Sequence, residues 1–398
     1  MTAPSRSLSA TGVSRRSFFE TSVAAAAAAA LPGGAFAAGN DRIRLGLVGC
    51  GGRGVGAALQ AVAAGEGVEI VAIGDLFADQ VAAAATALTA TGRAAPGGLF
   101  HGDRAADLVI ASDVDGVILA TPPCCRPAEV AAAVRAGRHV YAEAPVGVDA
   151  AGVRACVAAV EEGRRRGLSL ASGLASRHHG ATQATVAAIG AGAIGRPMSA
   201  LAIRHVGLPW VRPVQPSWSA EEAAARNWIA HPRLSGGGFL ADLVTAFDRC
   251  VWALGEPTPL EATAVPAAVA MPTPPGRGTA AAVRISFTDG STLQAEIVRR
   301  EGIEDRVEER VRGSGGFADL RQHTVAGRSC GGPAADAGGH AACMASFVAS
   351  LRGSSRRDDL AAACHCTMLA VMARTAVESG STATWHDLWQ AFPAPRSA

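Results

Sequence analysis

The 398-residue chain contains no lysine, since all 36 of its basic residues are arginine. The protein therefore has no side-chain amine to form a Schiff base or to act as an ammonium general acid. Tyrosine and asparagine are also rare, with Tyr141 the one tyrosine and Asn40 and Asn227 the two asparagines. Such a narrow choice of residue types is typical of genome composition, so arginine in place of lysine does not by itself indicate a function.

Excess charge of either sign is missing as well. The 36 basic and 34 acidic residues are spread along the chain and give a formal net charge of +2, which argues against a nucleic-acid partner. The nine cysteines are an odd number and form no C-x-x-C pair. Cys364-His365-Cys366 is too tightly spaced for an ordinary zinc site and lies in a helical, alanine-rich run. We therefore expect no structural metal and no disulfide framework.

The N-terminal segment carries signals for export rather than for folding. Ser14-Arg15-Arg16-Ser17-Phe18-Phe19 is a twin-arginine pattern, and the apolar run Val23–Leu31 follows it. This run is shorter than the roughly 20 residues that a membrane span needs, and Ala35-Phe36-Ala37 offers a small-residue cleavage site. We expect residues 1–38 to be a twin-arginine signal peptide, and the mature protein to be periplasmic or extracytoplasmic without a stable membrane span.

Two domains are expected after the signal peptide. In residues 42–173 short apolar strands alternate with helical segments, which predicts an α/β fold with a doubly wound parallel sheet of the Rossmann kind. Residues 174–398 predict an α+β domain with an open, mainly antiparallel sheet. Its candidate strands are 199–206, 260–269, 279–287, 292–299 and 306–311, and helices are expected after Ser235–Gly238 and near 339–352 and 358–378.

A glycine-rich run at the end of the first expected strand is the strongest single motif. Gly49-Cys50-Gly51-Gly52-Arg53-Gly54 follows the apolar stretch 43–48 and precedes a helical pattern. In the order strand, G-x-G-x-x-G, helix, the glycines permit a tight turn, close approach of a pyrophosphate, and close packing of helix on strand. Asp75 ends the next expected strand, where a carboxylate accepts ribose hydroxyls. No basic residue follows Asp75 directly, so the motif favours NAD over NADP.

Other polar residues stand at the ends of later strands. Ligands of parallel sheets bind beyond the carboxyl ends of the strands, so we expect the following residues to converge near the glycine run: Thr121, Glu143, Arg177 and His178. Imidazole titrates near neutral pH, which makes His178 the candidate acid or base, with His179 as its competitor and a solvated loop histidine as the alternative. Arg177 is expected to hold a substrate carboxylate or a cofactor phosphate.

Together these residues resemble the Gfo/Idh/MocA oxidoreductases, typified by glucose-fructose oxidoreductase and inositol dehydrogenase. The matching motifs are Gly49–Gly54, Ala120-Thr121-Pro122, Ala136-Gly137-Arg138-His139-Val140, Glu143-x-Pro145, Gly192-Ala193-Ile194-Gly195-Arg196, and Ser235–Gly238 leading to Asp248 and Trp252. The twin-arginine leader and Arg226-Asn227-Trp228 resemble the family's exported members. The resemblance implies that Thr121 and Pro122 contact the cofactor backbone and that Glu143 approaches the nicotinamide ribose. Arg126, just past the fourth expected strand, is a further candidate to hold a substrate carboxylate or a cofactor phosphate, unless it is a surface residue at a helix start.

The chain departs from the family at two positions. Family members usually carry Glu-Lys-Pro where this chain has Glu143-Ala144-Pro145, and that lysine assists proton transfer. They also place a histidine three or four residues before the aspartate that matches Asp248, where this chain has Val244 and Thr245. Asp248 itself is expected to bind substrate hydroxyls or to pair with a nearby arginine.

The resemblance implies hydride transfer between nicotinamide and a sugar or polyol, in a protein that self-associates through its open sheet. Two alternatives remain open. One is a nucleotide-binding relative that has lost catalysis, and the other is a glycoside hydrolase that uses bound NAD as a redox relay.

Overall fold

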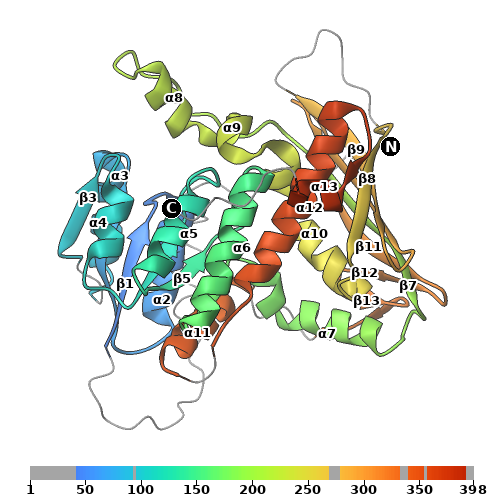
Figure 1. Ribbon diagram of the computed structural model, residues 1–398, viewed down its shortest axis with the longest axis horizontal. Helices are drawn as coiled ribbons and strands as arrows, with labels where there is room; N and C mark the ends of the chain where they lie inside the picture. The colour runs from blue at the N-terminus through green and yellow to red at the C-terminus, as the bar shows by residue number, and fades with distance from the viewer. Residues whose placement is uncertain (1–41, 93–95, 269–277, 332–338, 354–355, 391–398) are drawn as a thin grey trace, which may run out of the picture. The chain divides into compact units, whose positions relative to one another are not determined.

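The computed structural model describes residues 42–92, 96–268, 278–331, 339–353 and 356–390 (Figure 1). The predicted twin-arginine signal peptide, residues 1–38, lies outside the described residues. The described part of the chain contains two sheets, which are built from consecutive halves of the sequence.

The first sheet is parallel and has six strands in the order β3-β2-β1-β4-β5-β6. Its strands are β1 (Ile43–Val48), β2 (Val68–Asp75), β3 (Gly98–His101), β4 (Gly116–Leu119), β5 (His139–Ala142) and β6 (Leu170–Ser172). The connections carry α2 (Gly52–Ala63), α3 (Ala78–Thr89), α4 (Ala105–Ala111), α5 (Arg126–Arg135) and α6 (Ala150–Arg165). The predicted doubly wound parallel sheet is confirmed. The sequence analysis did not predict β3 and α4, because both are short and every second residue of β3 is exposed.

The second sheet has nine strands in the order β14-β13-β12-β11-β7-β10-β9-β8-β15. The longer strands are β7 (Pro197–Val206), β8 (Pro259–Val265), β9 (Thr279–Phe287), β10 (Thr292–Arg299) and β11 (Arg306–Gly313). Short strands complete its two ends: β12 (Phe317–Asp319), β13 (Thr324–Val325), β14 (Arg328–Ser329) and β15 (Ala383–Thr384). Only β7 and β10 pair in parallel, so the prediction of a mainly antiparallel sheet is confirmed.

The second half also contains helices, several of which pack on this sheet or on the first one. They are α7 (Gly180–Gly190), α8 (Ala220–Arg226), α9 (Pro232–Ser235), α10 (Gly237–Leu254), α11 (His340–Leu351), α12 (Leu360–Ser379) and α13 (Trp385–Gln390), with the 3-10 helices η1 (Ala175–His178) and η2 (Trp228–Ala230). Figure 1 shows α8 and α9 as a run, in yellow-green, that extends away from the second sheet.

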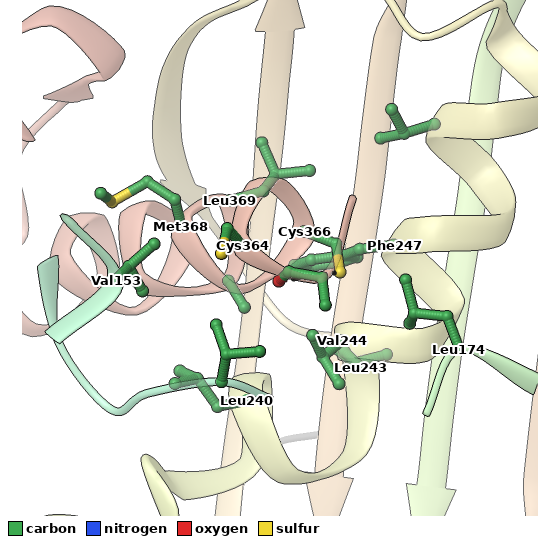
Figure 2. Close-up of a cluster of buried hydrophobic side chains, with 14 of the residues drawn as sticks. Val153, Leu174, Leu240, Leu243, Val244, Phe247, Cys364, Cys366, Met368 and Leu369 are labelled. Carbon is green, nitrogen blue, oxygen red and sulfur yellow. Dashed lines mark hydrogen bonds between the residues drawn. The ribbon is translucent and has the colours of Figure 1, made fainter. Parts of the chain in front are cut away.

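The largest buried cluster joins α10 and α12 to both sheets. In Figure 2 Leu243, Val244 and Phe247 of α10 lie beside Cys366 of α12, and Leu240 and Leu369 belong to the same cluster. By length and composition α12 could cross a membrane, but 67% of its apolar window is buried within the protein, as in a core helix. The Cys364-His365-Cys366 triplet belongs to this helix, and both cysteines are buried among apolar side chains.

Candidate functional site

The turn between β1 and α2 has the geometry of a dinucleotide cradle. Gly49 has φ +93°, and a Cβ atom there would lie 2.7 Å from the backbone of Thr121. A Cβ atom on Gly54 would lie 1.9 Å from the carbonyl oxygen of Gly49, so both positions require glycine. At Gly51 and Gly52 a Cβ atom would meet nothing within 4 Å. No side chain caps the N-terminus of α2, which leaves its amides and dipole for an anion.

Asp75 faces this turn from the end of β2. One carboxylate oxygen accepts a hydrogen bond from the Cys50 amide at 2.8 Å, and the other accepts from the Phe77 amide at 3.0 Å. Burial raises the pKa of Asp75, while the two amides oppose the shift. The carboxylate therefore joins the turn after β1 to the turn after β2. Each oxygen keeps a second acceptor site, so the predicted contact with ribose hydroxyls fits this geometry.

Arg53 links the glycine turn to the end of β5. Its Nε donates to Glu143 Oε1 at 2.7 Å, and its Nη2 contacts the Tyr141 hydroxyl at 3.4 Å. Tyr141 is fully buried, and the Glu143 side chain is 9% exposed. Two predicted cofactor residues, Arg53 and Glu143, thus form one ion pair at the mouth.

A buried network holds the turn after β4. Arg126 Nη2 donates to the Thr121 carbonyl at 2.5 Å, and Nη1 donates to the Pro145 carbonyl. The Thr121 hydroxyl donates to Glu129 Oε2 at 2.5 Å. Arg126 is 4% exposed, so the surface alternative for this residue is wrong. The guanidinium braces the backbone at Thr121 and Ala144-Pro145, because these carbonyls have no strand partner. Glu129 was missed, because a carboxylate in a helix usually faces solvent.

Glu129 gives a stability prediction. Burial raises its pKa to about 7 from 4.5, against the hydrogen bond from Thr121 and the charge of Arg126. A raised carboxyl pKa means that the folded state binds more protons between these values, so this group's contribution to stability falls as pH rises from 4.5 to 7. Glu129→Gln should remove this decline, which is about 3 kcal/mol at most. Urea unfolding of both proteins at pH 5 and pH 8 measures the free energy of unfolding. If it falls equally in the unmodified protein and in Glu129→Gln, the raised pKa does not belong to Glu129.

The run from α8 to α9 crosses the carboxyl edge of the parallel sheet. Arg226 of α8 binds both oxygens of Asp79 at 3.0 Å, just after β2. The carbonyl of Leu234 in α9 accepts from the Cys124 amide at 3.3 Å, just after β4. Because β1 lies between β2 and β4, residues 226–234 join the ends of the two strands that flank β1, the strand that leads into the glycine turn. We call residues 218–235 the strap.

An aromatic sandwich holds one end of the strap. The Arg226 guanidinium lies 3.9 Å from the ring centroid of Phe77 and 4.8 Å from that of Trp218. Glu222 binds its Nε at 2.8 Å, and the Arg226 side chain is 10% exposed. The sequence analysis singled out Arg226-Asn227-Trp228 only because it resembles a stretch in the family's exported members. The contacts of Arg226 could not be predicted, because Phe77 and Asp79 lie about 150 residues earlier.

His178 contacts residues that the sequence analysis did not expect beside it. Its Nε2 is 2.7 Å from Arg357 Nη2 and 3.4 Å from Asp359 Oδ2. Residues 357–359 run along the free edge of β6, since the Leu170 amide donates to the Arg357 carbonyl and the Ser172 amide to Asp359. Glu143 lies on the other side of β6, next to β5. The position of His178 at the mouth and its catalytic role both stay predictions.

Arg177 and Asp248 come together, as one alternative foresaw. Arg177 Nε donates to Asp248 Oδ1 at 2.9 Å, and Nη2 binds Glu256 at 2.8 Å. They line a cavity of about 560 Å³ whose other lining residues include Asp359 and His365. The lining contains no residue of the glycine turn, Thr121 or Glu143. Burial raises the pKa of Asp248 against the charge of Arg177. The pair is thus placed in a cavity apart from the cradle, and substrate binding there stays a prediction.

The two departures have different surroundings. Ala144 is partly buried beside the network of Arg126. Val244 is 2% exposed and packs in the core shown in Figure 2, whereas Thr245 is partly exposed. Earlier in α10, Asp242 accepts two hydrogen bonds of 2.6 Å from Arg299 at the end of β10. The sequence analysis missed this bidentate pair, because its partners are 57 residues apart.

Three comparisons bear on this geometry. The family model "Oxidoreductase family, NAD-binding Rossmann fold", of the Gfo/Idh/MocA type, matches residues 43–171. A "Glycosyl hydrolase family 109 protein" from Solibacter usitatus is 38% identical over 109 residues. That match covers 27% of this chain and 25% of the relative, so the chain aligns with about a quarter of that protein.

Solved structures extend the likeness of fold beyond the first sheet. A putative myo-inositol dehydrogenase from Sinorhizobium meliloti 1021 superimposes with a TM-score of 0.62 at 22% identity, covering 86% of this chain and 99% of that one. Scyllo-inositol dehydrogenase from Lactobacillus casei, with bound NAD(H) and scyllo-inositol, gives 0.66 at 17% identity over 86% and 99%. The motif, the cradle and the family match thus agree that residues 43–171 are similar to the NAD-binding Rossmann domain of the Gfo/Idh/MocA oxidoreductases.

Proposed function

We propose that this protein binds NAD at the glycine turn and oxidises a sugar or polyol. The observation that carries the proposal is the uncapped start of α2 behind Gly51 and Gly52, with open space in front of both glycines and Asp75 across the turn. The amides of the turn would hold the diphosphate, and Asp75 would accept the ribose hydroxyls. NAD, when bound, supplies the acceptor for a hydride.

Oxidation of a hydroxyl also releases a proton, which the chain's own polar groups at the carboxyl edge of the parallel sheet would accept. Ala144 and Thr245 provide no titrating group, whereas Thr121 and Glu129 form a hydroxyl–carboxyl pair whose acid has a pKa of about 7. A pKa near the working pH suits a general acid or base. Arg126 fixes this pair and the Ala144-Pro145 backbone in one arrangement.

We propose NAD rather than NADP as the cofactor. Asp75 ends β2 and Asp79 lies in the first turn of α3, so a ribose 2′-phosphate would meet two carboxylates. Arg226 is the nearby cation, but Asp79 and Glu222 already engage its guanidinium. Titration with both dinucleotides tests the preference, and tighter binding of NADP would overturn it.

Gly51→Val tests the cradle directly. Gly51 has φ −72° and ψ 176°, which any residue can adopt, and the added side chain would point into open space. We expect unchanged thermal stability and NAD affinity at least about 10-fold weaker, equivalent to about 1.4 kcal/mol. Calorimetric titration and thermal unfolding measure the two effects.

Gly56→Ala is the matched control for this substitution. A Cβ atom on Gly56 would meet only Arg53 Nη1, at 4.0 Å, and alanine is the better residue within a helix. We expect unchanged NAD affinity in this variant. Unchanged affinity in Gly51→Val as well would place the diphosphate elsewhere and overturn the proposal.

NAD-dependent glycoside hydrolysis is the second candidate. Two observations favour it: the curated relatives are named glycosyl hydrolase family 109 proteins, and the strap would keep a dinucleotide in place between turnovers. A chromogenic glycoside assay without added NAD separates it from oxidation of free sugars with added NAD. Failure of both assays by a protein that binds NAD would support the relative that has lost catalysis, as Ala144 and Thr245 suggest.

We also propose export and self-association, on the sequence patterns alone. The twin-arginine pattern of residues 14–19 supports export to the periplasm or beyond, and the open second sheet offers a face for a second copy. Fractionation of cells that express the full chain, and light scattering of the mature protein, test these two proposals.

A further inference from the structure

Two adjacent thiols lie at the rim of the cradle. Cys124 and Cys125 stand between the end of β4 and the start of α5, and their sulfur atoms are 3.6 Å apart. Of the nine cysteines, all within the described residues, only Cys124, Cys125 and Cys330 are not buried. The pair is therefore the one place in the described chain where two accessible cysteines are neighbours.

The local backbone keeps both sulfur atoms in one turn. The Cys125 amide donates to the Pro122 carbonyl at 3.0 Å, which closes the turn, and Cys125 is the N-cap residue of α5. The hydrogen bond between the two thiols, followed by burial, raises the pKa of Cys125, so Cys125 stays the protonated partner. The hydrogen bond from Cys125 is the largest cause that lowers the pKa of Cys124, to about 7.

The turn also connects the cofactor site to the strap. It begins at Thr121 and Pro122, which are expected to contact the dinucleotide, and it is braced by Arg126. On its outer side the Cys124 amide binds the Leu234 carbonyl of the strap. A group attached to both sulfur atoms would restrict this turn, which is bonded to the strap at Cys124 and leads from Thr121 and Pro122 into α5.

We propose that Cys124 and Cys125 form a dithiol site for trivalent arsenic, and that an arsenical held there weakens dinucleotide binding. Trivalent arsenic is pyramidal, so two sulfur atoms bonded to one arsenic lie close together, as the two at 3.6 Å do here. An ion that prefers linear coordination would need sulfur atoms farther apart. The site itself is independent of the proposed function, and only the effect on the dinucleotide rests on it.

The reaction needs no oxidant. An organoarsenic oxide, R–As=O, reacts with the two thiols to form two As–S bonds. The As=O oxygen leaves as water with the two thiol protons, and arsenic stays trivalent. Because one arsenic atom binds two sulfur atoms of the same turn, a single added thiol competes poorly with the cyclic product, whereas a small dithiol can displace it.

Phenylarsine oxide is the probe for this site, applied to the reduced full-length protein. Intact mass spectrometry should show one adduct that survives excess 2-mercaptoethanol and is removed by 2,3-dimercaptopropanol. Cys124→Ser and Cys125→Ser should each lose the resistant adduct. Cys330→Ser, the matched control at the third accessible cysteine, should keep it. A resistant adduct in both serine variants of the pair would overturn the site.

NAD titration of the same samples tests the coupling. We expect at least a tenfold loss of NAD affinity in the arsenical adduct, recovery after the dithiol wash, and protection of the pair by saturating NAD. Unchanged affinity in the adduct would overturn the coupling while the site stands. Absence of NAD binding to the untreated protein would instead overturn the proposed function, and the adduct pattern would still decide the dithiol site.

Discussion

Gly54→Ala should weaken NAD binding about 100-fold and lower the free energy of unfolding by about 1–3 kcal/mol. The added Cβ atom would lie 1.9 Å from the carbonyl oxygen of Gly49, which is backbone and cannot rotate away. α2 must therefore move away from β1, and the amides at its start move with it. A loss of affinity of about 100-fold corresponds to about 2.7 kcal/mol. Calorimetric titration and urea unfolding measure both effects.

The control for Gly54→Ala lies two residues further along the same helix. Gly56→Ala makes the same chemical change without a contact closer than 4.0 Å, so it should bind NAD normally and be slightly more stable. Equal behaviour of the two variants would mean that close packing of α2 on β1 does not support the cofactor site.

Arg226→Ala should release bound NAD about 30-fold faster than the unmodified protein. The substitution removes the ion pairs with Asp79 and Glu222 and two contacts with aromatic rings. Exposed ion pairs contribute little, and each cation–π contact contributes about 0.5–2 kcal/mol. If the lost interactions of Arg226 together contribute about 2 kcal/mol to holding the strap closed, release of NAD becomes about 30-fold faster. Stopped-flow displacement of fluorescent NADH measures the rate.

Arg306→Ala is the control for the strap. Arg306 also forms an ion pair with a glutamate, Glu308, but it lies in β11 of the second sheet and is about half exposed. Its loss should leave the release rate unchanged. If Arg226→Ala also leaves the rate unchanged, the strap does not retain the dinucleotide, and the argument that it favours the hydrolase candidate fails.

Local patterns predicted those parts of the fold that depend on neighbouring residues. The bounds of β9 and β10 agree with the prediction because apolar alternation and the Asp289-Gly290 turn define them locally. Asp149 caps α6 through an equally local contact, accepting a hydrogen bond from the Gly152 amide. β12 to β15 are two or three residues long, which is too short for the apolar alternation of a strand to be recognised. They form because neighbouring strands provide backbone hydrogen-bond partners.

At the candidate site, too, local motifs could be predicted and long-range contacts could not. The glycine turn and Asp75 could be predicted, because the chemistry of each is contained in a short motif. The contacts of His178 could not, because residues 357–359 occupy the edge of β6 that the prediction left open. Arg226 on Asp79 and Arg299 on Asp242 each join residues far apart in sequence, and one sequence carries no record of such pairs.

The strap has a consequence for the order of events during synthesis. All six strands of the first sheet lie before residue 173, whereas Arg226 follows 54 residues after Ser172. At about 5–20 residues per second, a ribosome makes those 54 residues in roughly 3 to 11 seconds. For that interval the residues proposed to hold the dinucleotide have been made, whereas the strap that crosses their edge of the sheet has not.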